Sequence, residues 1–310
     1  MKIKRGDLVI IFGGPNKIYL AQVPKDENEI QNKQLEANLG NQRLIHNRNG
    51  IFDLATCIGK EYGQKIFWDP DKKGHWVVIL KPTPELITKS ITHHTQILYR
   101  ADISLILLLL DLLPGKRVVE SGTGSGSLSY SLATAILPNG HLFTFDFHSK
   151  RKDYAVELFE KAGLSHIVSV NERDAYEKSA FLIENSQDGH DLKEQTIDAV
   201  FLDLPSPWKA IYNVNQVIKH FGRLVTFTPC IEQAQKMVQT LHEHDFSGVR
   251  TFEILCKPWG INLDADVYEM EEYEDAVTIG ADKEFVNYQL PQLNHTGYLT
   301  VATANRIDGF

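Results

Sequence analysis

The pattern of hydrophobic and polar residues divides the chain into two kinds of sequence. In the first 81 residues, short β-prone runs alternate with turn residues: Leu8–Phe12 precedes Gly-Gly-Pro-Asn, Ile18–Val23 precedes Pro-Lys-Asp-Glu-Asn, and Trp76–Leu80 precedes Lys-Pro-Thr-Pro. This spacing predicts a small β domain. A helix is then expected from Thr95 to Leu112, because Pro114-Gly115 ends the apolar stretch.

From Lys116 onward, strand-like and helix-like segments alternate. We expect strands near 117–121, 141–146, 167–171, 197–203, 223–228 and 250–256, and helices near 125–136, 150–162, 208–220 and 231–243. Such alternation predicts a parallel sheet with helices on both faces. The last strand, Tyr298–Ala302, is expected to form an antiparallel hairpin with 250–256 at the edge of that sheet.

A glycine-rich loop follows the first of these strands. The acid Glu120 ends the strand, and Gly122, Gly124 and Gly126 alternate after it before a helix begins. A dinucleotide fingerprint needs G-x-G-x-x-G, and counted from Gly122 its last position is a serine. A carboxylate just before G-x-G-x-G is instead typical of the loop that binds S-adenosyl-L-methionine (AdoMet) in methyltransferases. The predicted fold class is therefore α/β, a Rossmann-like AdoMet methyltransferase sheet with an antiparallel edge hairpin.

Acids also end the next two strands, where ligands of open parallel sheets bind. Asp146 ends the second strand and can accept both ribose hydroxyls of AdoMet, with Arg151 placed to pair with it. Asp174 follows the third strand and is placed to accept the adenine amine, although aspartate is also an ordinary turn residue.

The fourth strand ends in the segment DAVFLDLPSPW. It places Asp203 before two prolines and Trp208. Proline fixes the backbone, so a carboxylate and an aromatic ring can be held in a defined orientation over a base. An acid beside an aromatic ring suits hydrogen bonding to an exocyclic amine while the base is stacked. A helix-capping and packing role for Asp203 and Trp208 is the alternative.

Composition and charge narrow the function classes. The 310 residues suggest about two domains. The longest apolar run is too short to cross a membrane, and no signal-type stretch follows the N-terminus. Residues 1–89 carry 14 basic and 10 acidic side chains, whereas the remainder carries 18 basic and 30 acidic ones. A polyanion would therefore meet the N-terminal region and the catalytic face, while the acidic run Asp264–Asp275 is expected to be a solvated insert.

The cysteines and histidines suggest one competing chemistry. Three cysteines without a CxxC pair indicate a reducing compartment and no zinc, and His93-His94 lack partner ligands at useful spacing. Cys230 follows a proline at the end of the fifth strand, where a nucleophilic cysteine of a cytosine-C5 methyltransferase could stand. The loop after the fourth strand lacks the second cysteine usual in such RNA enzymes, which favours a buried or helix-capping thiol.

Taken together, these segments resemble the catalytic subunits of the eukaryotic tRNA adenine-58 N1-methyltransferases. The resemblance covers most of the chain, and the run TQILY within it is more specific than any glycine loop. It is carried by KPTPEL at 81–86, HHTQILYRADISLI at 93–106, ESGTGSGSLS at 120–129, FTFDFHSKR at 143–151, VFLDLPSPW at 200–208, TPCIEQ at 228–233 and HTGYLTVAT at 295–303.

The resemblance implies roles for individual residues. Asp203 would be the catalytic acid at the target adenine. The AdoMet site would comprise Leu98, Glu120, Gly122, Thr123, Gly124, Ser125, Gly126, Ser127, Asp146, Arg151, Asp174 and Asp203. The tRNA would be contacted by Gln96, Tyr99, Pro205 and Trp208. No metal is implied.

The resemblance also implies an organisation. Residues 1–85 would form a small β-barrel domain that contacts tRNA and the partner, and residues 86–310 the methyltransferase domain, with an acidic insert near 262–290. The enzyme would be a nuclear heterotetramer of two such subunits and two non-catalytic paralogues.

The chain departs from the family pattern at three positions. Ser121 stands where alanine is common, Asp146 where glutamate is commoner, and His94 where an arginine is usual, which puts one tRNA or interface contact in doubt. Three other readings stay open: a methyltransferase acting on protein or small molecules, a cytosine-C5 enzyme using Cys230, and a non-enzymatic RNA-binding subunit.

Overall fold

The N-terminal part of the chain is built from antiparallel strands. The computed structural model describes residues 1–14, 17–25, 44–47, 50–67, 76–92, 97–186, 189–255 and 296–305. The first sheet has the order β2-β1-β6-β5, with β1 Leu8–Phe12, β2 Ile18–Gln22, β5 Lys65–Phe67 and β6 Trp76–Leu80. A two-stranded sheet of β3 (Leu44–Asn47) and β4 (Gly50–Asp53) precedes the short 3-10 helix η1 (Leu54–Cys57). The prediction of a β-rich N-terminal region is confirmed.

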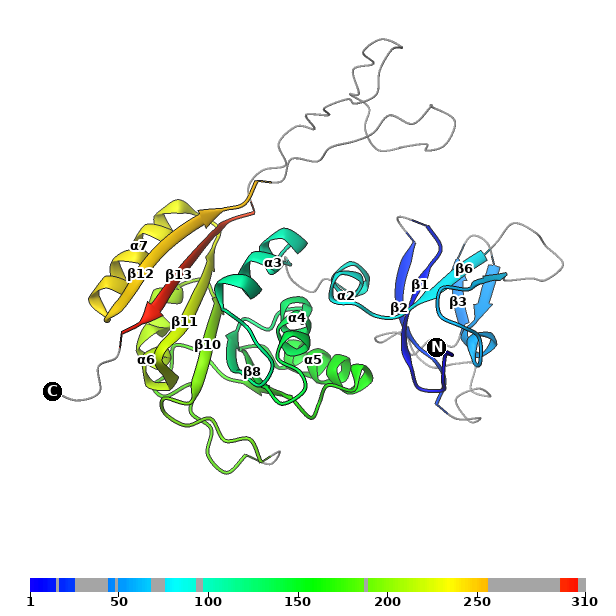
Figure 1. The fold of residues 1–310 in the computed structure, drawn as a ribbon, viewed down its shortest axis with the longest axis horizontal. Helices are drawn as coiled ribbons and strands as arrows, with labels where there is room; N and C mark the ends of the chain where they lie inside the picture. The colour runs from blue at the N-terminus through cyan, green and yellow to red at the C-terminus, as the bar shows by residue number, and fades with distance from the viewer. Residues whose placement is uncertain are drawn as a thin grey trace, which may run out of the picture.

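Strand β1 is buried on both faces, because its side chains alternate between two cores. Val9 and Ile11 pack in a cluster that also contains Phe52 of β4. Leu8 and Ile10 belong to the cluster that contains Ile87 of α2 (Pro84–Ser90) and continues into the larger sheet. Helix α2 therefore lies between the N-terminal strands and α4, as Figure 1 shows. The N-terminal sheet and the second half of the chain thus share a continuous core.

The second half of the chain contains a seven-stranded sheet with the order β12-β13-β11-β10-β7-β8-β9. Its strands are β7 Arg117–Ser121, β8 His141–Asp146, β9 Val168–Glu172, β10 Ile197–Asp203, β11 Ile218–Thr228, β12 Phe246–Glu253 and β13 Tyr298–Ala304. β7, β8, β9, β10 and β11 are parallel, whereas β13 is antiparallel to both β11 and β12. The predicted parallel sheet with an antiparallel hairpin at its edge is confirmed.

Helices cover both faces of this sheet (Figure 1). The apolar cluster on one face includes residues of α3 (Arg100–Leu109), α4 (Ser127–Ala135) and α5 (Ser149–Ala162). The cluster on the other face includes residues of η2 (Pro207–Ala210), α6 (Ile211–Val217) and α7 (Ile231–Glu243). Within the part of the chain that the structure describes, no helix has the length and apolar character needed to cross a membrane.

Two predicted helices have different bounds in the structure. The helix expected over 95–112 begins only at Arg100, because Tyr99 has an extended backbone, and it ends at Leu109. The helix expected over 208–220 starts as the 3-10 turn η2 and ends at Val217, since Ile218 already pairs with Ile197 in the sheet. The periodicity identified both elements, but sheet pairing decided where the second one stops.

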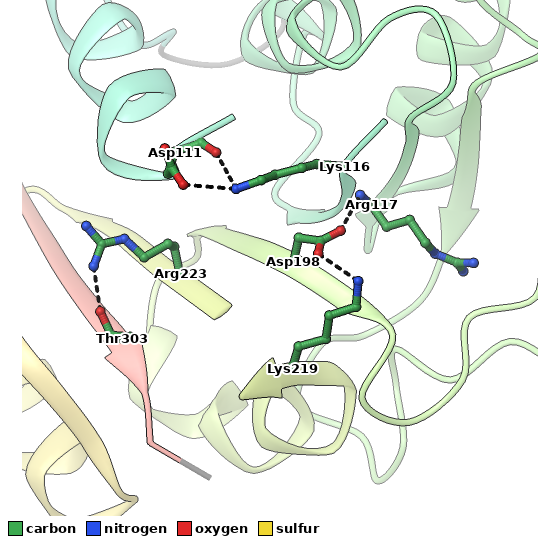
Figure 2. Close-up of polar contacts among 7 residues, drawn as sticks. All are labelled: Asp111, Lys116, Arg117, Asp198, Lys219, Arg223 and Thr303. Atoms are coloured by element: carbon green, nitrogen blue, oxygen red, sulfur yellow. Dashed lines mark hydrogen bonds and ion pairs between the residues drawn. The ribbon is translucent and has the colours of Figure 1, made fainter. Parts of the chain in front are cut away.

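Polar contacts fix the strands at the end of the sheet opposite the glycine loop. Figure 2 shows Asp198 of β10 accepting two hydrogen bonds, one from the Arg117 backbone N–H at 2.8 Å and one from Lys219 Nζ at 2.7 Å. Lys116 and Asp111 form an ion pair at 3.1 Å nearby, and Arg223 of β11 donates to Thr303 of β13. Asp198 therefore joins the start of β7 to β11 across β10.

We expect Asp198→Ala to destabilise the fold without affecting cofactor affinity. The change leaves the Arg117 N–H and the Lys219 ammonium without their shared acceptor, which costs about 1–2 kcal/mol of unfolding free energy. Urea denaturation measures the loss, and Asp153→Ala, at an exposed position on α5, is the matched control. Equal urea midpoints for the two variants would contradict the role of Asp198.

Candidate cofactor and base site

The glycine loop joins β7 to α4 through backbone conformations that favour glycine. Gly122, Gly124 and Gly126 have φ values of +103°, +55° and +78°, and Gly126 is the N-cap residue of α4. A side chain at Gly122 would overlap the backbone carbonyl of Asp203, and one at Gly126 would press on Leu158. The loop is thus packed against the end of β10. Its glycines allow the positive φ angles of the turn and let the loop backbone approach its neighbours closely.

Glu120 is buried beneath this loop, with only one of its carboxyl oxygens bonded. Oε2 accepts hydrogen bonds from Ser129 Oγ at 2.5 Å and Thr144 Oγ1 at 2.6 Å. Oε1 is also buried and has no hydrogen-bond partner among the described residues. Burial raises the pKa of Glu120 to about 8, and the nearby carboxylates Asp203 and Asp146 add to this effect. Such an oxygen is suited to a donor or cation supplied by a ligand.

The hydroxyl groups of the loop connect it to its surroundings. Thr123 Oγ1 lies 2.6 Å from Thr144 Oγ1, which extends the chain of hydrogen bonds from Glu120 into the loop. Ser127 is the first residue of α4, and its Oγ lies 2.8 Å from Oγ1 of Thr88 in α2. Both residues are buried. Ser125 is buried as well. The start of α4 is therefore tied to the helix that packs on the N-terminal sheet.

Asp146 at the end of β8 is held in a fixed orientation. Its Oδ2 accepts the Gly124 N–H at 2.9 Å, and its Oδ1 accepts the His148 N–H at 2.9 Å. Arg151 of α5 lies 3.7 Å from Oδ1, as the sequence suggested. A carboxylate offers about four lone-pair directions, so Asp146 keeps acceptor capacity beyond these contacts.

Asp174 and Leu98 are two further members of the expected AdoMet site. Asp174 lies two residues beyond β9, and its Oδ1 accepts the Tyr176 N–H at 2.9 Å. This is the local turn contact that aspartate commonly makes, so Asp174 does have the turn role that the sequence offered as an alternative. Leu98 is buried and Tyr99 is exposed just before α3. Gln96 and His94 lie outside the described residues, as does the acidic run 264–275.

Asp203 ends β10 directly beside the glycine loop. Leu202 pairs with Ser121 in the sheet, and Ser121 pairs with Phe145. Asp203 and Asp146, the residues after Leu202 and Phe145, therefore lie at the same edge of the sheet. Burial raises the pKa of the half-buried Asp203 carboxyl to about 6. After it, Pro205 is exposed and Trp208 is half-buried, with Lys236 Nζ 4.5 Å from the Trp208 ring.

Comparison with known proteins identifies the family. The family model described as "tRNA methyltransferase complex GCD14 subunit" matches residues 75–284. The chain is 38% identical over 273 residues to the tRNA (adenine(58)-N(1))-methyltransferase catalytic subunit of Dictyostelium discoideum, covering 88% of this chain and 77% of that protein. The chain belongs to the GCD14 family. Its Schizosaccharomyces pombe relative of the same description is 34% identical over 260 residues, covering 83% of this chain and 65% of that protein.

Solved structures confirm the fold of this GCD14-family chain. A SAM-dependent O-methyltransferase of Thermotoga maritima superposes with a TM-score of 0.71 at 25% identity, covering 100% of this chain and 97% of that one. The tRNA (m1A58) methyltransferase TrmI of Aquifex aeolicus gives a TM-score of 0.64 at 22% identity, covering 99% and 100%. The predicted Rossmann-like methyltransferase fold is therefore confirmed along the chain.

Several residues that shape the site were absent from the sequence-based set. Ser129 and Thr144 hold Glu120, and Thr88 holds Ser127. Tyr176 and Gln233 contact the loop after Asp203. Ser129 lies nine residues after Glu120 in the helix that follows the glycine loop, and its side chain is fully buried.

Cys230 lies directly before α7. Cys230 is exposed, so the interpretation as a buried thiol is wrong. It occupies the N-cap position of α7, but its thiol makes no capping hydrogen bond to the helix. Among the residues that the structure describes, no group of three or more His, Cys, Asp or Glu side chains is arranged to hold a metal ion.

The buried Glu120 gives this family member a specific pH dependence of stability. Its pKa rises from the ordinary 4.5 to about 8 on folding, so the folded chain binds the extra proton and loses stability as the pH rises through this window. The side chain of Glu120→Gln does not titrate. We therefore expect the unfolding free energy of this variant to rise, relative to that of wild type, by roughly 1 kcal/mol per pH unit between about pH 5 and 8. Urea denaturation without AdoMet measures this difference, with Glu160→Gln as the exposed control. Parallel stability curves for wild type and Glu120→Gln would refute it.

Proposed function

We propose that this chain transfers the methyl group of AdoMet to N1 of adenine 58 in the T-loop of tRNA, as the catalytic subunit of a two-subunit-type enzyme. The observation that carries the proposal is the packing of Asp203 on Gly122, which puts a base-side acid against the cofactor loop. The GCD14 family match and the adenine-58 enzymes among its relatives support adenine 58 of tRNA as the substrate.

The residues present fit AdoMet. Glu120 Oε1 is a buried acceptor without a partner among the described residues, and Gly122 and Gly126 let the loop backbone pack closely on Asp203 and Leu158. In our proposal, Glu120 binds the amino-acid end, Asp146 with Arg151 holds the ribose hydroxyls, and Asp174 accepts the adenine amine. Leu98, Thr123, Gly124, Ser125 and Ser127 complete the site. These three acids come from three different strand ends, which spaces them along an extended ligand.

When bound, AdoMet supplies an electrophilic methyl group on a sulfonium sulfur. The lone pair of adenine N1 forms the new N–C bond while the C–S bond breaks. The electron pair of the broken C–S bond stays on sulfur. No base is needed to activate N1, but the adenine becomes cationic. Asp203 is placed to accept a hydrogen bond from the N6 amine, which positions the ring and stabilises the positive charge as it develops. The half-buried setting of Asp203 strengthens that stabilisation.

For the wider assembly, we propose the organisation that the family resemblance implies. Residues 1–85 form the domain that contacts tRNA and the partner, and residues 86–310 form the methyltransferase domain. Near the base, Gln96, Tyr99, Pro205 and Trp208 contact the tRNA, whose target adenine must be flipped out. The partner is a non-catalytic paralogue, present with this chain as two copies each in a nuclear heterotetramer.

Methyl transfer from labelled AdoMet to unmodified tRNA tests the proposal, with and without the co-expressed paralogue. Mass spectrometry identifies the modified nucleoside. We expect N1-methyladenosine, formed only with the partner. Methylcytidine that disappears in Cys230→Ser would instead assign the cytosine-C5 reaction, and methylation that requires no RNA would assign a protein or small-molecule substrate.

A further inference from the structure

The peptide group between Pro205 and Ser206 is held from two sides. Its carbonyl oxygen, on Pro205, accepts a hydrogen bond of 3.2 Å from Gln233 Nε2. Its N–H, on Ser206, donates a hydrogen bond of 2.9 Å to Tyr176 Oη. Both polar groups of one peptide plane are therefore bonded to side chains from other elements, and rotation of that plane would break both contacts.

The sequence makes these side-chain contacts necessary. Pro205 and Pro207 have no N–H, so Ser206 offers the only backbone donor in the Pro-Ser-Pro segment. The segment has no sheet pairing, since β10 ends at Asp203 and η2 begins at Pro207. Its orientation therefore depends on partners that the rest of the chain supplies.

The two side chains that bond this peptide come from different elements of the fold. Gln233 lies on the first turn of α7, and Lys236 on the same helix contacts the Trp208 ring. Tyr176 belongs to the turn after β9, where Asp174 accepts its N–H at 2.9 Å. Tyr176 thus connects the turn proposed for the adenine of AdoMet to the segment proposed for the target base.

We infer that Tyr176 and Gln233 are positioning residues that clamp the Pro205–Ser206 peptide, so that Asp203 and Pro205 face the target adenine in one fixed orientation. This inference rests on the proposed function. The clamp acts on alignment and not on affinity: the tRNA is bound over a wide surface, whereas methyl transfer needs N1 in line with the reacting methyl group. Loss of one contact therefore lowers kcat more than it changes KM.

The test compares Tyr176→Phe, Gln233→Leu and the double variant in the full chain, assembled with the partner that supports wild-type activity. Each single change should lower kcat for N1-methyladenosine formation between about 10- and 100-fold. The KM for tRNA and the Kd for AdoMet should stay within about threefold of wild type, and Tm should shift by no more than about 4 °C. Because both contacts hold the same peptide, the double variant should lose less than the product of the two single effects.

Matched controls are Tyr212→Phe, at an exposed position on α6, and Gln239→Leu, whose side chain bonds Glu243 on the exposed side of α7. Both should keep wild-type kcat. If the wild-type complex makes N1-methyladenosine and the clamp variants match its kcat, the clamp is overturned and the proposed function stands. Loss of AdoMet binding in the clamp variants also overturns it, because the effect would then be structural. Absence of N1-methyladenosine from the wild-type complex overturns both proposals.

Discussion

Replacing Asp203 by alanine is expected to lower the turnover number at least about 100-fold while AdoMet binding is retained. The carboxylate is the group placed to bind the N6 amine and to stabilise the cationic product, and the half-buried setting of its side chain at the end of β10 makes that stabilisation strong. Single-turnover methyl transfer to tRNA measures the first effect, and calorimetric titration with AdoMet measures the second.

The pH dependence separates this role from a loss of packing. Because burial raises the pKa of Asp203 to about 6, wild-type kcat/KM should rise as the carboxyl ionises through that pH and then level off. Asp203→Asn, which keeps the shape but cannot ionise, should be slow at every pH and lack this rise. Unchanged activity in Asp203→Ala would sink the catalytic role, and Asp153→Ala on the exposed side of α5 provides the control.

The parts of the site that sequence could predict are those tied to strand ends. Glu120, Asp146 and Asp203 each stand at the last or penultimate position of a strand whose bounds the hydrophobic pattern gave correctly. In a parallel sheet, such positions meet at one edge regardless of the connecting helices. Their proximity was therefore a consequence of topology, and the close approach of Gly122 to Asp203 and the hydrogen bond from Gly124 to Asp146 confirm it.

The contacts that orient these acids could not be predicted, because they join distant segments. Thr144 reaches Glu120 from the neighbouring strand, and Ser129 reaches it from α4. Nothing in the local sequence marks a threonine in the middle of a buried strand as a donor to an acid 24 residues earlier. Side-chain hydrogen bonds of this kind depend on register and rotamer, which periodicity does not encode.

Helix α2 is a different kind of omission, since its signals were present. Thr83 caps the helix by accepting the Leu86 N–H, Pro84 occupies the first turn, and Glu85 follows. This is a helix start that capping rules describe. Lys-Pro-Thr-Pro was interpreted only as a turn signal after Trp76–Leu80, and no element was predicted for residues 84–90. Its consequence is structural, because α2 carries the Thr88 contact to Ser127.

The glycine loop allows the second strong prediction. Gly122→Ala is expected to weaken AdoMet binding at least about 100-fold and to destabilise the fold, because the methyl group would overlap the Asp203 carbonyl at a φ of +103°. Relief of the overlap requires β7 and β10 to separate at the edge where Glu120 and Asp203 stand. Calorimetric titration with AdoMet measures the affinity, and thermal unfolding measures the stability.

Gly115→Ala distinguishes crowding from backbone strain. Gly115 has a similar φ of +89°, but a Cβ there meets no atom within 4 Å. This control therefore carries the strain of a left-handed alanine, about 1 kcal/mol, without disturbing the loop, and its AdoMet affinity should match wild type. If Gly122→Ala also bound AdoMet like wild type, the close approach of the loop to Asp203 would not be what shapes the cofactor site. The shared edge of β7 and β10 would then lose its place in the mechanism, since the base-side acid and the cofactor loop are proposed to act as one packed unit.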